Sequence, residues 1–176
     1  MPDREVSVFL DGWQIECCAD PPGPGDHVRW PLIWLDDADG PGGMQVDWRS
    51  DLLPVSARNE PDDLLLRHGV LTAYWRGPAP ARTRGRLVAD VHGGVPEQVP
   101  PVAGSVVSVG LVDQAYRRSA PRTYVPVSGD FRLRPVPRSP KWFSSDRWDE
   151  DHLPDLVRSD SGVLVRLSME PALLGT

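Results

Sequence analysis

Proline and glycine restrict the fold of this chain more than any other feature of its sequence. The 176 residues include 20 Pro and 16 Gly, about a fifth of the chain. Proline interrupts a helix because it lacks the amide hydrogen and its ring clashes with the preceding turn, and glycine weakens helices and strands alike. Few windows remain that could hold a helix of average length. A helical bundle is therefore excluded.

Short segments rich in β-branched and aromatic residues, each bounded by Gly, Pro or charged residues, predict strands. These segments are residues 26–35, 70–75, 86–91, 105–112 and 163–169. The predicted fold class is mainly β, a compact antiparallel β-barrel or sandwich with at most one or two short helices. Because chains of this size rarely divide, we expect a single domain over residues 1–176.

Two turn sequences predict hairpins. Asp11-Gly12 suits a type I′ turn, and folding about it places Trp13, Ile15 and Cys17 together on a buried face, with Trp13 as a core anchor. The same alternation places Cys18 on the opposite face. Ser128-Gly129 predicts a second hairpin between residues 123–127 and 130–134.

Two further segments carry distinct local patterns. Residues 59–69 have an N-cap candidate, acids at the start, bases at the end and a terminal Gly, which predicts a short helix; a Leu-rich strand is the alternative. Residues 144–161 form an acidic stretch that is long for a bare loop, and we expect an irregular, binding-prone loop here before the final strand.

Charge and targeting signals limit the partners. The net charge is −6 and the isoelectric point about 5.1, which argues against nucleic-acid binding. Residues 64–141 have a net charge of +8 between acidic ends, and we expect the parts to neutralise one another when folded. No signal-peptide pattern and no long apolar run is present, so we predict a cytoplasmic protein without membrane contact.

Common catalytic and phosphate-binding motifs are absent, so candidate sites depend on smaller patterns. Asp90 and His92 stand two residues apart before a glycine turn, which on a strand would put an acid and an imidazole on one side. Cys17 and Cys18 could bind a soft metal ion, with His92, or respond to oxidants. Neighbouring cysteines do not easily reach disulfide geometry, so we expect reduced thiols.

Tryptophan and arginine provide a third candidate. The chain has seven Trp, and Trp30 lies in a pattern that suits core burial. Trp75 with Arg76, and Trp148 in the acidic stretch, could stack on or grip a ligand at the surface.

Two segments carry recognisable motifs. The first holds Trp13-Gln14 and Cys17-Cys18 of a Trp-Gln-x-x-Cys-Cys motif, followed by residues 25–30. The second holds His92-Gly93 of a His-Gly motif, followed by a Gly-x-Val strand at Gly104. Both segments resemble those of an uncharacterised family of small actinobacterial proteins, a domain of unknown function. The resemblance covers under half of the chain and implies kinship, without an activity, substrate or cofactor.

Three hypotheses follow for function. The leading one is a non-enzymatic binding or protein-interaction module for a protein or small-molecule partner, with no cofactor, using Asp90, His92, Trp75, Arg76 and Trp148. The alternative is a metal- or redox-responsive protein that uses Cys17, Cys18 and His92 and could hold zinc. The third is a hydrolase-like enzyme around Asp90 and His92.

Overall fold

The computed structural model describes residues 4–53, 63–78, 81–143 and 153–171 and confirms a mainly β fold with one short helix. The helix in this part of the chain is α1 (Gly12–Cys17). With only six residues, it is far shorter than the roughly 20 that a bilayer-crossing helix needs. The strands are β1 (Glu5–Asp11), β2 (His27–Trp30), β3 (Leu32–Leu35), β4 (Met44–Gln45), β5 (Arg49–Leu52), β6 (Asp63–His68), β7 (Leu71–Arg76), β8 (Arg84–Ala89), β9 (Val102–Ala120), β10 (Thr123–Val136) and β11 (Leu156–Met169).

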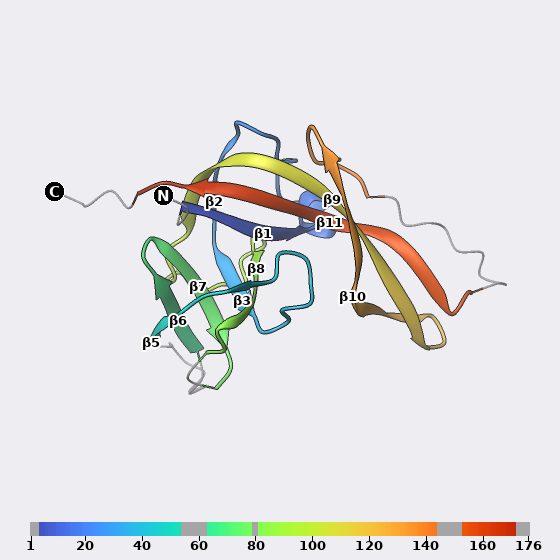
Figure 1. The fold of residues 1–176 in the computed structure, drawn as a ribbon, viewed down its shortest axis with the longest axis horizontal. Helices are drawn as coiled ribbons and strands as arrows, with labels where there is room; N and C mark the ends of the chain where they lie inside the picture. The colour runs from blue at the N-terminus through green and yellow to red at the C-terminus, as the bar shows by residue number, and fades with distance from the viewer. Residues whose placement is uncertain (1–3, 54–62, 79–80, 144–152, 172–176) are drawn as a thin grey trace.

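The strands form one curled sheet in the order β10-β9-β11-β1-β8-β3-β7-β6-β5, with β2 beside β9 and β4 beside β8 (Figure 1). Most neighbours are antiparallel, whereas β1 runs parallel to β8 and β3 parallel to β7. Over the described residues the sheet does not close on itself, so the architecture is sandwich-like and not a barrel.

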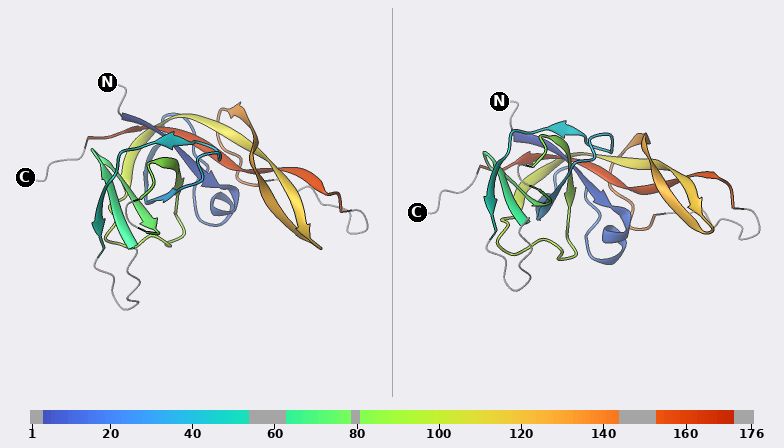
Figure 2. Two further views of the ribbon diagram at one scale, coloured as in Figure 1. Left: turned by 60° about the horizontal axis from the view of Figure 1, so that its bottom comes forward. Right: turned by 90° about the horizontal axis from the view of Figure 1, so that it is seen from below.

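The longest strand, β9, connects the two ends of the molecule. Its first residues pair with β2, and from Val109 to Ala120 it pairs with β10, while β11 lies along its other edge (Figure 2). Strands β9, β10 and β11 thus extend as an arm away from the β5–β6–β7 end. The curl lets one apolar cluster include side chains from both parts of the sheet, such as Leu66 of β6, Leu87 of β8 and Val163 of β11.

Tryptophan side chains are central to this cluster. Trp30 is buried, as predicted, and Trp34 is 1% exposed. The Trp34 indole donates a hydrogen bond to the carbonyl of Arg82 (2.8 Å) and packs edge-on against Trp48 at 5.1 Å. A buried indole with a satisfied N–H contributes area without an unpaired donor.

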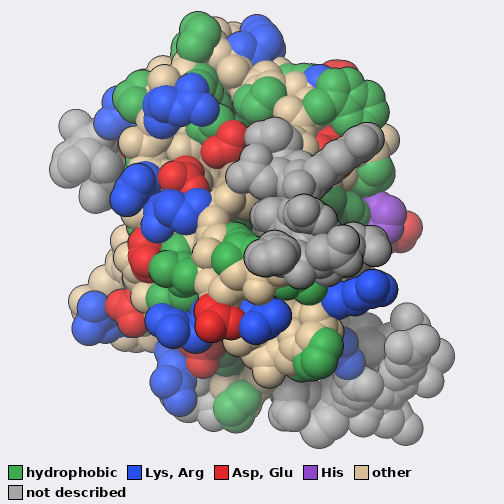
Figure 3. Space-filling model, turned by 90° about the vertical axis from the view of Figure 1, so that its right-hand side faces the viewer, with side chains coloured by type: hydrophobic (Ala, Val, Ile, Leu, Met, Phe, Trp, Pro, Cys, Tyr) green, Lys and Arg blue, Asp and Glu red, His purple; other side chains and the backbone are tan. Residues whose placement is uncertain are grey.

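Ion pairs join the basic middle of the chain to its acidic ends. Arg138 bonds Asp26 (2.6 Å), and Arg118 bonds Asp155 (2.7 Å). Figure 3 shows Lys and Arg side chains interspersed with Asp and Glu on one side of the molecule. On that side Lys and Arg side chains therefore do not form a separate positive face.

The predicted hairpin at Asp11-Gly12 is wrong. Strand β1 pairs with β11 over its whole length and with β8 at Val8 and Phe9, so neither edge is free for residues 13–17. The chain instead leaves the sheet after Asp11 and turns into α1, where Ile15 is buried but Trp13 is 51% exposed and Cys17 is also exposed. Trp13 is therefore not a core anchor.

The predicted hairpin at Ser128-Gly129 is also wrong, because β10 continues through it. The turn lies at Pro121-Arg122, and Ser128-Gly129 falls in a bulge where the β9–β10 register shifts between Pro126 and Phe131. Buried Gln114 of β9 holds this bulge, since its amide nitrogen donates to the carbonyls of Ala115, Val127 and Asp130. A long-range amide contact thus overrides the local turn preference.

Two other segments differ from their predictions. Residues 63–68 form β6, so the Leu-rich strand is correct and the helix is wrong there; residues 54–62 lie outside the described part. Strand β11 begins at Leu156, so residues 156–161 are strand and not loop. Trp148 and the rest of residues 144–152 lie outside the described residues.

We expect Trp34→Ala to lower the free energy of unfolding by about 3–5 kcal/mol, because it removes a fully buried indole. Trp13→Ala should cost less than about 1 kcal/mol, because half of that side chain faces solvent. Urea denaturation followed by circular dichroism measures both. Equal losses in the two variants would contradict the assignment of the core.

Candidate functional site

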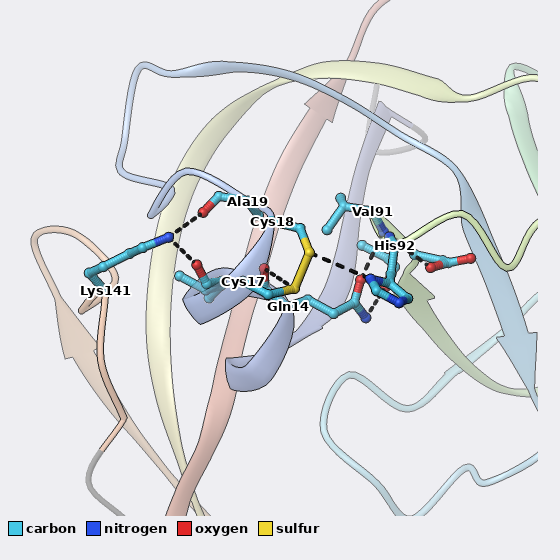
Figure 4. The surroundings of a disulfide bond; sticks show 10 residues. Gln14, Cys17, Cys18, Ala19, Val91, His92 and Lys141 are labelled. Carbon is cyan, nitrogen blue, oxygen red and sulfur yellow. Dashed lines mark hydrogen bonds between the residues drawn. A yellow bond between two sulfur atoms is a disulfide. The ribbon is translucent and has the colours of Figure 1, made fainter.

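The helix α1 ends in the cysteine pair, and the structure joins Cys17 and Cys18 in a disulfide (Figure 4). The disulfide shows that the prediction of reduced thiols is wrong. Both residues are exposed, so the assignment of Cys17 to a buried face and Cys18 to the opposite face is wrong as well. Cys18 is the C-cap of α1, with φ −137° and ψ −21°, and the chain turns there out of the helix. Because this segment is a helix end and not a strand, successive side chains do not alternate between faces.

His92 lies beside this pair, in the loop that follows β8. Its Nδ1 atom is 3.5 Å from Sγ of Cys18, and the Trp13 ring contacts the imidazole edge-on at a centroid distance of 5.1 Å. One ligand atom each from Cys17, Cys18 and His92 lies within 4.8 Å of the others. These three residues are called the cysteine–histidine site below.

Gln14 positions the two parts of this site relative to one another. Its side chain is 4% exposed and bonds the β8 end twice: Nε2 donates to the carbonyl of Ala89 (3.1 Å), and Oε1 accepts from the amide of Val91 (2.8 Å). Figure 4 shows this side chain reaching from α1 to the His92 loop. The amide thus ties together segments 75 residues apart in the sequence.

Asp90 supports the loop through the backbone of His92 and makes no described hydrogen bond to the imidazole ring. Strand β8 ends at Ala89, so the prediction that Asp90 and His92 share one side of a strand is wrong. Asp90 is buried and its Oδ1 accepts the backbone amide of His92 (3.0 Å), whereas His92 is exposed. Oδ2 is buried without a hydrogen-bond partner among the described residues, and a Cβ added at Gly94 would lie 2.8 Å from it.

Lys141 and Glu16 fix the outer side of α1. The Lys141 ammonium donates to the carbonyls of Ile15 and Ala19, at the C-terminal end of the helix, where a positive charge is favourable. The carboxylate of Glu16 accepts the amide of Phe143 (2.8 Å). The cysteine pair is therefore presented on a turn held by groups from two other segments, residues 89–91 and residues 141–143.

A groove of about 640 Å³ opens beside Cys18, with Val91 and Trp30 among its lining residues. On its wall Arg138 binds Asp26 through both carboxylate oxygens (2.6 and 3.1 Å). Hydrogen bonds from Arg138 hold the pKa of Asp26 below its usual value. The groove gives a ligand or reductant access to the sulfur of Cys18.

Trp75 and Arg76 lie elsewhere, at the end of β7. Trp75 is 7% exposed and its indole donates to the carbonyl of Pro78 (3.2 Å), so it belongs to the core and is not a surface stacking platform. Arg76 is exposed, and both residues line a groove of about 410 Å³ that contains neither Asp90 nor His92. The proposed ligand residues therefore do not form one site.

The sequence did not predict that Gln14, Lys141 and Trp13 surround the cysteine–histidine site. Trp13 was assigned to the core on the buried face of a hairpin that does not form. Lys141 is the only lysine in a chain whose other 18 basic residues are arginine, and this is the only sequence feature that singles it out.

Fold and site together define a small, mainly β protein with an exposed cysteine pair at the end of a short helix and a histidine from a separate loop beside it. The chain belongs to a family of unknown function, DUF6578, whose model matches residues 4–169. Neither the curated proteins nor the solved structures gave a match.

We expect Gln14→Leu to lower the free energy of unfolding by about 1–3 kcal/mol, because the amide of Val91 loses a buried acceptor while side-chain volume is kept. It should also raise hydrogen exchange at the amides of Val91 and His92. Gln45→Leu, at an exposed position of β4, is the matched control and should change neither. Unchanged exchange in Gln14→Leu would show that this amide does not hold the loop.

Proposed function

We propose that this protein is a redox-gated metal-binding module. In the reduced state the thiolates of Cys17 and Cys18 and the imidazole of His92 bind one soft or borderline ion such as Zn²⁺, and the disulfide prevents binding. The observation that carries the proposal is the convergence of the three ligand atoms within 4.8 Å. Sulfur and imidazole nitrogen are ligands that zinc prefers.

The spacing of sulfur and nitrogen supports this assignment. In a tetrahedral zinc site with Zn–S near 2.3 Å and Zn–N near 2.0–2.1 Å, a sulfur and a nitrogen ligand lie about 3.6 Å apart. Sγ of Cys18 and Nδ1 of His92 are separated by 3.5 Å. For Cys17 to take part, the sulfur–sulfur bond must open and the two sulfur atoms must move to about 3.8 Å apart, the separation at a tetrahedral zinc ion.

The gating reaction is a thiol–disulfide exchange. A dithiol reductant transfers two electrons and two protons to the Cys17–Cys18 bond and is itself oxidised to a disulfide. Zinc then displaces the two thiol protons to solvent, because thiolate is the binding form. Three protein ligands leave a fourth position for water or for a side chain of a partner.

The geometry favours this function over the hydrolase hypothesis. The carboxylate of Asp90 accepts the backbone amide of His92, so it does not hold the imidazole as the third group of a nucleophile–base–acid arrangement would. The broad class of the leading hypothesis, a non-enzymatic binding module, is kept, and its ligand becomes a metal ion at the cysteine–histidine site.

Zinc competition against a chromophoric chelator tests the proposal on untagged protein. After reduction with a phosphine and removal of the reductant under nitrogen, we expect one Zn²⁺ per chain, and none at the same affinity for the oxidised protein. Cys18→Ser and His92→Ala should each weaken binding by at least about tenfold, since each removes one ligand.

His68→Ala is the matched control, because His68 is exposed and its ring contacts only the carbonyl of Asp47 among the described partners. It should bind zinc like the unmodified chain. Equal zinc affinity of the oxidised and reduced forms, or an unchanged affinity in His92→Ala, would overturn the proposal.

A further inference from the structure

A second pocket lies at the opposite end of α1 from the cysteine pair. It has a volume of about 140 Å³, and its walls come from the end of β1, from β8 and β9, from the loop at residues 37–41 and from the bulge of β10. Asp11, the last residue of β1, and Tyr116 of β9 are among its polar lining residues. It is called the Asp11 pocket below.

The β10 bulge that forms one wall is held firmly. Gln114 donates to the carbonyls of Val127 and Asp130 on either side of the bulge (2.9 and 3.1 Å). The guanidinium of Arg158 bonds the carboxylates of Asp130 (2.7 Å) and Asp113 (3.2 Å). The pocket wall is therefore part of a bonded network and does not depend on a free loop.

The charges of the pocket are unbalanced. Two carboxylates, Asp11 and Asp37, meet one guanidinium, and Arg86 bonds Asp37 (Nε–Oδ2 3.2 Å) while lying over the Phe9 ring at 5.5 Å. The Asp11 carboxylate makes no hydrogen bond or ion pair with any residue that the structure describes. Within the described residues the Asp11 carboxylate thus lacks a hydrogen-bond partner, and Arg86 acts on it only through its charge.

Burial raises the pKa of two acidic side chains that line this pocket, Asp11 and Tyr116. Desolvation raises the pKa of Asp11, and the charge of Arg86 offsets this only in part. Desolvation also raises the pKa of the neighbouring Tyr116 phenol, and the negative charge of Asp11 adds to that shift. A positive charge placed in the pocket would therefore be stabilised.

We infer that the Asp11 pocket binds a small organic ammonium ion, with the Asp11 carboxylate as its counter-ion and Phe9, Pro126 and Val127 around its apolar part. The volume suits a molecule of a few heavy atoms and excludes a folded partner. An anion is the weaker candidate because the guanidinium of Arg86 already bonds Asp37, and its Nη1, which lacks a described acceptor, is itself buried.

Three probes of equal length test the charge preference: butylammonium, 1-butanol and butyrate, titrated at neutral pH and low salt by calorimetry and by thermal shift. We expect saturable one-to-one binding of butylammonium alone. Asp11→Asn should weaken it by at least tenfold, and Ser128→Trp, at the rim of the pocket, should block it.

Asp39→Asn is the matched control, because Asp39 is an exposed neighbour that does not line the pocket. It should bind butylammonium like the unmodified chain. Asp11→Asn should also raise the melting temperature of the ligand-free protein, since it removes an ionised carboxylate from a desolvated position. Preferential binding of butyrate, no saturable binding of butylammonium, or unchanged binding by Asp11→Asn would overturn the inference.

Discussion

Strand β1 is paired along both edges, by β11 and by β8, and both sites depend on this pairing. With no edge free, the chain must leave the sheet directly after Asp11. The short turn that results is α1, which has Asp11 at one end and the cysteine pair at the other. Gly12 begins that turn under the ring of Phe143, where a Cβ would lie 2.8 Å from the ring and would push it away.

Buried polar side chains then position the segments around α1. Gln14 joins α1 to the loop after β8, and Gln114 holds the bulge of β10. Each amide satisfies backbone groups that would otherwise be buried and unpaired, and the penalty for leaving such groups unpaired exceeds the modest net gain of an ordinary hydrogen bond. The two residues thus fix the geometry of these segments, and removing either one costs stability because it leaves backbone groups unpaired.

Sequence patterns predicted the elements whose burial follows directly from alternation. Residues 163–169 alternate apolar and polar side chains and form the end of β11, and Trp30 is buried as its surroundings indicated. Asp-Gly and Ser-Gly report only local turn preference, and strand pairing overrode it in both cases. Both edges of β1 are paired where a hairpin about Asp11-Gly12 would need one, and β10 pairs with β9 on either side of Ser128-Gly129. The sequence left a site formed by Cys18 and His92 open as an alternative prediction. The local sequence pattern does not mark Gln14, the residue that holds the two segments together, so its role could not be predicted.

The central claim is that Cys17, Cys18 and His92 bind a metal ion together once the disulfide is reduced. X-ray absorption spectroscopy at the zinc edge of the reduced, zinc-loaded protein tests it most directly. The account predicts two sulfur ligands near 2.3 Å and an imidazole nitrogen near 2.0–2.1 Å, with the imidazole signal lost in His92→Ala. A zinc ion bound only by nitrogen and oxygen, or an imidazole signal that persists in His92→Ala, would contradict it.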